Sequence, residues 1–189
     1  MADPHGNERL TAMTGAVLLV LFIVECMTLL NLGNMLTLHV FLGFLLLGPV
    51  SLKIGSTLWR FTRYYTGSAP YVKKGPPAPL QRVLGPLVIL TTVTVLGSGV
   101  ALVLSGSGPG QFGWHRIHQL SFLVWAAVIV VHVGSYLPRL PRLLTGKAGQ
   151  QARSLLAASA TRWLLLCGSL AAGAIVAVLA YHLSANWGG

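Results

Sequence analysis

Five long runs of apolar residues restrict this chain more than any other feature. They occupy residues 11–32, 37–58, 83–104, 117–137 and 163–183. Each run reaches the roughly 20 mostly apolar residues that a helix needs to span a bilayer. Only 8% of the 189 residues are charged, whereas a soluble domain carries about 25%. The sequence therefore predicts an all-α, multi-pass membrane protein whose five transmembrane helices contact membrane lipid.

The basic residues predict the orientation of these helices. Arg9 precedes the first run, and Arg116 stands alone in the connection before the fourth. The other loop residues form two clusters, after the second and the fourth runs: Arg60, Arg63, Lys73, Lys74 and Arg82, then Arg139, Arg142, Lys147, Arg153 and Arg162. Because Lys and Arg collect on cytoplasmic loops, we expect the N-terminus inside and the C-terminus outside. The net charge of +10 thus reflects topology, and we expect no nucleic-acid partner.

The expected organisation has four parts. A cytoplasmic tail covers residues 1–10, a four-helix core residues 11–138, and a basic cytoplasmic connection residues 139–162. The fifth helix and an outer tail complete the chain over residues 163–189. The first run is too long for a signal-peptide core, so we expect a retained anchor. The Arg-, Ala-, Leu- and Gly-rich usage is typical of a high-GC bacterium, which indicates a bacterial cell membrane.

Five ionisable residues stand out within the apolar runs: Glu25, His39, Lys53, His118 and His132. Placing such a group in a bilayer costs roughly 2.5–3.5 kcal/mol on insertion scales, which indicates a function. His118 and His132 are 14 residues apart, about 21 Å along one helix face, with Trp125 midway. His39 and Lys53 have the same separation on the second run. Two parallel helices therefore present a His39–His118 pair at the outer level and a Lys53–His132 pair at the inner level.

The outer pair suits haem iron. Two neutral imidazoles on facing helices bind such an iron axially, and helical bundles commonly build cofactor sites from facing side chains. Gly43 lies one turn from His39, and Gly97 and Gly99 lie on the third run. Small residues at these positions leave room for a macrocycle against the backbone. For either histidine alone, a hydrogen-bonded contact between helices is an equally good interpretation.

This arrangement resembles the four-helix core of membrane b-type cytochromes. The residues that carry the resemblance are His118 and His132, with 13 residues between them, and His39 at the matching level of a parallel helix. The di-haem cytochrome b of quinol-oxidising complexes and ferric-reductase-like transmembrane domains have this spacing. The resemblance implies that His39 and His118 bind an outer haem b and that His132 is one ligand of an inner haem. Lys53 departs from it, because it stands where the family has a fourth histidine.

Several roles at these sites stay open. Lys53 either extends its ammonium toward the headgroups or binds a haem propionate, a quinone carbonyl or the iron itself. His132 either packs between helices, holds a second haem alone or joins Lys53 around a quinone. Glu25 is a proton-relay group or a partner of the outer site, and Trp125 is a core residue or an electron stepping-stone. Arg116 is a candidate for a haem propionate, which guanidinium groups bind well.

The sequence thus predicts electron transfer through b-type haem, from a membrane quinol to a partner redox protein. The chain would be a quinol-linked oxidoreductase or an electron-transfer subunit, with one haem or two. The alternatives are a haem-free transporter or proton channel that uses Glu25, Lys53 and His132, and a small membrane-anchor subunit of a larger complex. An absorption spectrum of the purified protein separates the first interpretation from both alternatives.

The basic clusters make the topology testable with reporter fusions. Fusions at Ser107 and Gly189 should report an outer location, and fusions at Gly75 and Gly146 an inner one. This pattern follows because twelve of the 13 Lys and Arg residues lie on or near one predicted side. A paired alkaline-phosphatase and fluorescent-protein assay measures both locations, and the reverse pattern would contradict the predicted orientation.

Overall fold

A computed structural model describes residues 4–76, 79–106, 111–136 and 160–184, and within these ranges the chain is helical with no strand. The elements are α1 (Pro4–Thr28), η1 (Leu29–Asn31), α2 (Leu32–Tyr65), α3 (Ala69–Lys74), α4 (Pro79–Ser105), α5 (Gln111–Gly134) and α8 (Ala160–Ser184). The expectation of an all-α chain is confirmed for this part. Most of the basic connection at 139–162, part of the outer loop at 107–110 and the tail at 185–189 lie outside the described residues.

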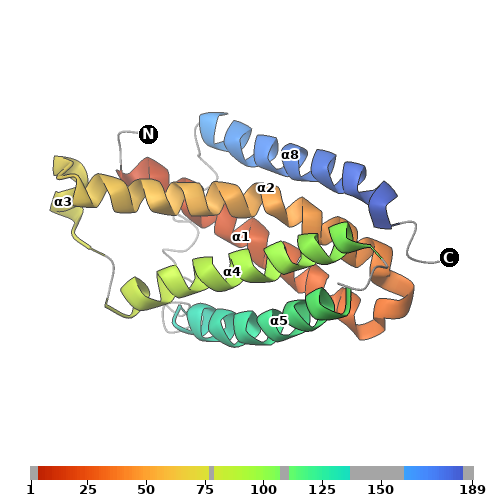
Figure 1. Cartoon of the computed structure of the whole chain (residues 1–189). Coiled ribbons are helices and arrows are strands. Elements are labelled where there is room, and N and C mark those ends of the chain that lie inside the picture. Colours follow the sequence, from red (N-terminus) through yellow and green to blue (C-terminus); the bar gives the residue numbers. More distant parts are fainter. Residues whose placement is uncertain (1–3, 77–78, 107–110, 137–159, 185–189) are drawn as a thin grey trace, which may run out of the picture.

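The long helices lie alongside one another in alternating directions (Figure 1). The helical run from Pro4 to Tyr65 is 62 residues long and folds back at η1, so α1 and α2 form a hairpin. A second hairpin consists of α4 and α5, and α8 packs along α2 on the outside of the bundle. As a result α2 and α5 run parallel, as the two-site arrangement requires. The bundle has an η1 end, where α1 turns into α2, and an α3 end, where α2 is followed by α3.

The helices extend beyond the apolar runs. Proline at the start of α1 and of α4 suits the first helical turn, where its missing N–H costs nothing. Residues 4–10, expected to form a tail, are therefore helical, and α5 begins at Gln111 rather than at residue 117. His115 and Arg116 consequently lie in the first turns of α5 and not in a loop before it.

The outer surface of the bundle is apolar. Large hydrophobic side chains are exposed on each of the long helices, including Leu90 of α4 at 64%, Val130 of α5 at 70% and Leu164 of α8 at 72% exposure. The helical run Pro4–Tyr65 and helices α4, α5 and α8 are long and apolar enough to cross a membrane. Water would not tolerate so continuous an apolar surface, whereas lipid tails cover it at no cost. The chain thus has the character of a transmembrane protein.

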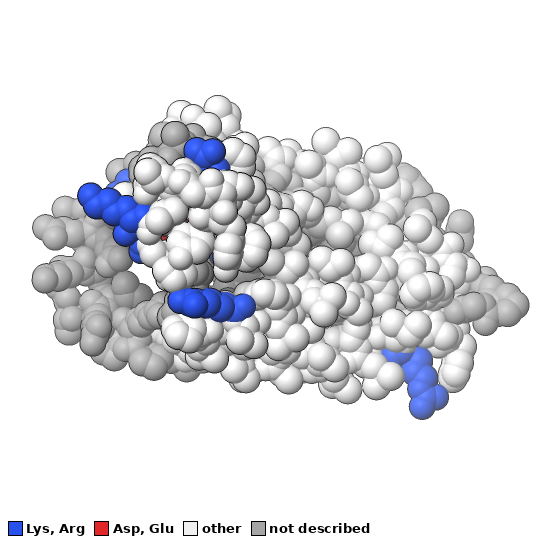
Figure 2. Space-filling view, turned by 60° about the vertical axis from the view of Figure 1, so that its left-hand side comes forward, with Lys and Arg blue, Asp and Glu red and all other residues white. Residues whose placement is uncertain are grey.

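Charged side chains gather at the α3 end. The end of α2, helix α3 and the start of α4 bring together Arg60, Arg63, Lys73, Lys74 and Arg82. Glu8 of α1 pairs with Arg60 at 3.0 Å and also with Lys74. Figure 2 shows the blue side chains concentrated toward this end, while the middle of the visible face is white. The charge distribution thus follows the long axis of the bundle.

Helix α8 contacts α2 through glycines. A Cβ at Gly48 would overlap the carbonyl oxygen of Ser169, and a Cβ at Gly173 would overlap that of Leu45. Leu45 is the residue four before Pro49, which has no N–H to give to this carbonyl. Glycine therefore lets the two backbones meet where α2 lacks an internal hydrogen bond, an arrangement common between membrane helices.

The crossing predicts a specific effect of one added methyl group. Gly173→Ala should lower the free energy of unfolding by about 1–3 kcal/mol, because the backbone of α2 occupies the position of the new Cβ. Thermal unfolding in detergent, followed by circular dichroism, measures the change. Gly168→Ala on the same helix is the matched control, since nothing lies within 4 Å of its Cβ position. Equal midpoints for the two variants would contradict the close crossing.

Candidate functional site

The structure brings His39 and His118 together at the η1 end. His39 lies on α2 and His118 on α5, and their ring centres are 6.3 Å apart with the ring planes at 74°. Both rings are partly buried. The two parallel helices thus place the histidines at one depth, as their positions in the apolar runs predict.

The Nδ1 atom of His39 is held by the end of α1. It lies 3.1 Å from a carboxyl oxygen of Glu25 and 2.9 Å from the hydroxyl of Thr28. That hydroxyl donates its own proton to the backbone carbonyl of Glu25 at 2.5 Å. Thr28 therefore acts toward the imidazole as an acceptor, which places the ring proton on Nδ1.

The Nδ1 atom of His118 is held by α4. It lies 3.0 Å from the carbonyl oxygen of Val95 and 3.1 Å from the hydroxyl of Ser98. Because a carbonyl only accepts, Nδ1 is again the donor. The Ser98 hydroxyl also lies 3.2 Å from that of Ser121 on α5, so α4 and α5 share a small polar contact at this level.

These contacts leave both Nε2 atoms with a lone pair. Neither Nε2 has a hydrogen-bond partner among the residues that the structure describes. A metal ion bound linearly by two imidazoles, with bonds of about 2 Å, holds the ring centres roughly 6 Å apart. The observed separation fits such an ion, and hydrogen bonds at the opposite nitrogen are the usual way to fix a metal-binding histidine.

The glycines of the site have different surroundings. A Cβ at Gly99 would lie 3.1 Å from Cε1 of His118, so this glycine makes room for the imidazole. A Cβ at Gly43 would lie 3.6 Å from a carboxyl oxygen of Glu25. Gly43 thus faces the carboxyl group that holds His39, while the Cβ position of Gly97 has nothing within 4 Å.

The second pair lies toward the α3 end. The Lys53 ammonium donates to the carbonyl oxygen of Thr11 at 2.6 Å, so the side chain crosses from α2 to α1. The Nδ1 atom of His132 on α5 is buried and has no partner among the described residues. This end of the bundle thus presents an ammonium donor on α2 and an unpaired imidazole nitrogen on α5.

Trp125 lies between the two pairs. It is 4% exposed, and its ring centre is 4.8 Å from that of Phe22 on α1 and 6.0 Å from that of Phe122. Its Nε1 donates to the hydroxyl of Thr92 on α4 at 3.1 Å. Trp125 is therefore a packed core residue that joins three helices, and it separates the polar groups of one end from those of the other.

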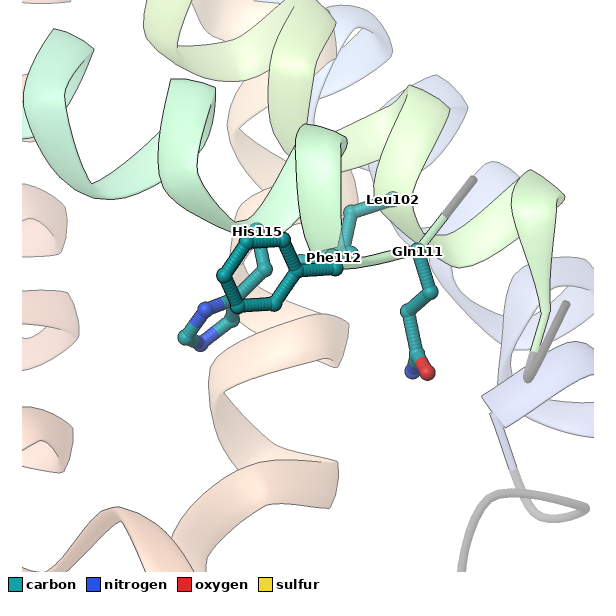
Figure 3. Close-up of a pocket in the computed structure, with 4 residues that line it drawn as sticks. All are labelled: Leu102, Gln111, Phe112 and His115. Carbon is teal, nitrogen blue, oxygen red and sulfur yellow. The ribbon is translucent and has the colours of Figure 1, made fainter. Parts of the chain in front are cut away.

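Arg116 and His115 lie apart from these contacts. Arg116 is exposed on α5, two residues before His118. His115 lines a shallow groove at the end of α4 and the start of α5, together with Leu102, Gln111 and Phe112 (Figure 3). The groove opens at the surface near the η1 end. The exposed position of Arg116 leaves its proposed role with a propionate as a prediction.

Sequence reasoning missed the hydroxyl groups that hold the site. Thr28, Thr92 and Ser98 are all buried, and each contacts the indole or an imidazole of another helix. Ser and Thr in an apolar run also bond to their own helix, so their presence alone does not indicate a site. Their role becomes clear only from the structure, where Thr28 and Ser98 contact the imidazoles and Thr92 contacts the Trp125 indole.

Comparisons with protein-family models, with curated proteins and with solved structures find no match to this chain. Within the described ranges, no three or more His, Cys, Asp or Glu side chains gather in a way that could hold a metal ion. The site is therefore an arrangement of two histidines, His39 and His118.

The Trp125 contact can be tested by removing its acceptor. Thr92→Val leaves the buried indole N–H without a partner, so the free energy of unfolding should fall by about 1–3 kcal/mol. Thr94→Val is the matched control, because the exposed Thr94 hydroxyl bonds only to Leu90 of its own helix. Thermal unfolding followed by tryptophan fluorescence compares the two. A larger loss for Thr94→Val would show that Trp125 does not depend on Thr92.

Proposed function

We propose that this chain is a membrane b-type cytochrome in which His39 and His118 bind haem through their Nε2 atoms. The observation that supports this most strongly is the matched anchoring of the two rings. Each Nδ1 donates to a neighbouring helix, and the ring centres lie 6.3 Å apart. Haem b bound there would carry one electron at a time by cycling between ferric and ferrous iron.

The protein's own residues would set the properties of this centre. Glu25 and Thr28 orient His39, while the Val95 carbonyl and Ser98 orient His118. The partners of an axial histidine tune its basicity and thereby the reduction potential. A carboxyl group on one ligand and a neutral carbonyl on the other make the two sides of the site unequal.

The electrons would come from a membrane quinol and pass to a partner redox protein. Oxidation of a quinol releases two electrons and two protons, so a single haem would accept the electrons one at a time. Under the topology proposed from the basic residues, the His39–His118 pair lies in the outer leaflet. The chain would act as a quinol-linked oxidoreductase or as the electron-transfer subunit of a complex in a bacterial cell membrane.

The distribution of polar groups favours this proposal over a channel. A proton channel or transporter needs polar groups that continue through the bilayer. Here Glu25 belongs to one end and Lys53 to the other, with Trp125 and Phe22 packed between them. An apolar layer thus separates two polar sites. This arrangement suits two bound redox groups better than it suits a continuous polar path for protons or solutes.

The absorption spectrum tests the proposal. The purified protein should show the Soret and α bands of a six-coordinate, low-spin haem b, and His39→Ala or His118→Ala should abolish them. His115→Ala is the matched control, because this histidine lies in the surface groove and should leave the spectrum unchanged. A pyridine haemochrome assay gives the haem content per chain. Unchanged bands in both axial variants would refute the assignment.

A further inference from the structure

The Lys53 ammonium has no carboxylate partner among the residues that the structure describes. The two acidic residues of the described ranges are engaged elsewhere, Glu8 with Arg60 and Lys74, and Glu25 with His39. An ammonium group has three N–H donors, and the structure pairs one of them, with the Thr11 carbonyl. A charged donor removed from water is costly unless further acceptors meet it, so this position calls for an additional acceptor.

The ammonium lies directly against the backbone of α1. A Cβ at Gly15 would lie 2.8 Å from Nζ of Lys53, so the charged end occupies the space beside this glycine. Lys53 therefore lies against α1 within the bundle. This contact argues against a side chain that merely extends into the headgroups.

His132 provides the complementary group. Its Nδ1 is buried and unpaired among the described residues, in contrast to Nδ1 of His39 and of His118. The ring packs 5.4 Å from that of Tyr136, at the end of α5. Lys53 thus offers donors, and His132 offers a nitrogen that has found no partner within the protein.

Hydroxyl groups connect this position with the α3 end. The Thr11 hydroxyl lies 2.9 Å from that of Ser56, and Asn7 donates to the Ser56 carbonyl at 2.9 Å. Asn7 is 2% exposed, and its side-chain oxygen also lacks a partner. One residue further, Glu8 joins the surface charges of Arg60 and Lys74. Polar groups thus continue from Lys53 to the basic end of the bundle.

We propose that Lys53 and His132 bind the head group of a lipid-soluble quinol, an inference that rests on the function proposed above. A quinol hydroxyl accepts a hydrogen bond from Lys53 and donates one to Nδ1 of His132. A phosphate or a carboxylate would satisfy Lys53 alone, because when ionised it only accepts. The exposed apolar surface of the surrounding helices suits a hydrocarbon tail.

The site also accounts for the products of oxidation. When a quinol becomes a quinone, both O–H bonds break and two electrons leave one at a time. Haem held by His39 and His118 would take each electron in turn, and the partner redox protein would reoxidise it between the two. The first proton would pass to Nδ1 of His132, and both protons would leave toward the α3 end past the hydroxyls of Thr11 and Ser56. Trp125 separates the position from the His39–His118 pair, so the two groups would bind at different depths.

The test measures quinol-dependent haem reduction in lipid nanodiscs. A naphthoquinol with one isoprene unit serves as the probe, and dithionite reduction records the total haem. Lys53→Met and His132→Phe should each slow quinol-dependent reduction by about tenfold or more, which corresponds to one charge-assisted hydrogen bond. The dithionite-reduced spectrum should stay unchanged. Lys73→Met and His115→Phe are matched controls at exposed positions and should reduce at the wild-type rate.

A second measurement needs no haem. Isothermal titration of the oxidised naphthoquinone into the nanodiscs should show binding to the wild type and its loss in Lys53→Met. Wild-type affinity in both site variants would overturn the quinol site, even where the haem bands are present. Two haems per chain, the second lost in His132→Ala, would also overturn it, since His132 would then bind iron. The absence of haem bands from the wild type would refute the proposed function instead, and the titration would still decide whether quinone binds here.

Discussion

The scarcity of hydrogen-bond partners in the hydrocarbon core governs the arrangement of this bundle. A polar side chain placed there must find its partner in the protein, because lipid supplies none. His39 finds its partners on α1 and His118 on α4. Each histidine is thus fixed by the other helix of its own hairpin. The α1–α2 and α4–α5 hairpins then meet through the two imidazoles and through Phe22 and Trp125.

The sequence predicts those features that repeat along a helix. Long apolar runs predict the helices, and alternating direction makes the second and the fourth parallel. The separation of 14 residues in each of two runs predicts two facing pairs, and the structure brings His39 and His118 together at the η1 end. These conclusions depend only on the rise and the rotation per residue of an α-helix, so they can be drawn before the packing of the helices is known.

The features that the sequence does not reveal depend on the rotation and contact of neighbouring helices. The partners of the imidazoles are a threonine, a serine and a backbone carbonyl, none of which follows a pattern along the chain. The glycine positions are similar in this respect. The Cβ position of Gly43 lies near Glu25, and that of Gly99 lies against the His118 ring, and neither neighbour follows from the spacing along the chain. The helix ends also extend past the apolar runs and include polar residues such as Asn7 and His115.

The contact between α2 and α8 has a consequence for the order of biogenesis. Helix α8 leaves the ribosome after α2, so α2 must enter the membrane before its partner exists. Until α8 docks, the Leu45 carbonyl, which Pro49 cannot satisfy, faces lipid, and an unsatisfied polar group costs several kcal/mol there. The nascent bundle therefore exposes this carbonyl to lipid until α8 packs against α2. A chain truncated before α8 would keep this cost, although both histidines of the η1 end precede the truncation.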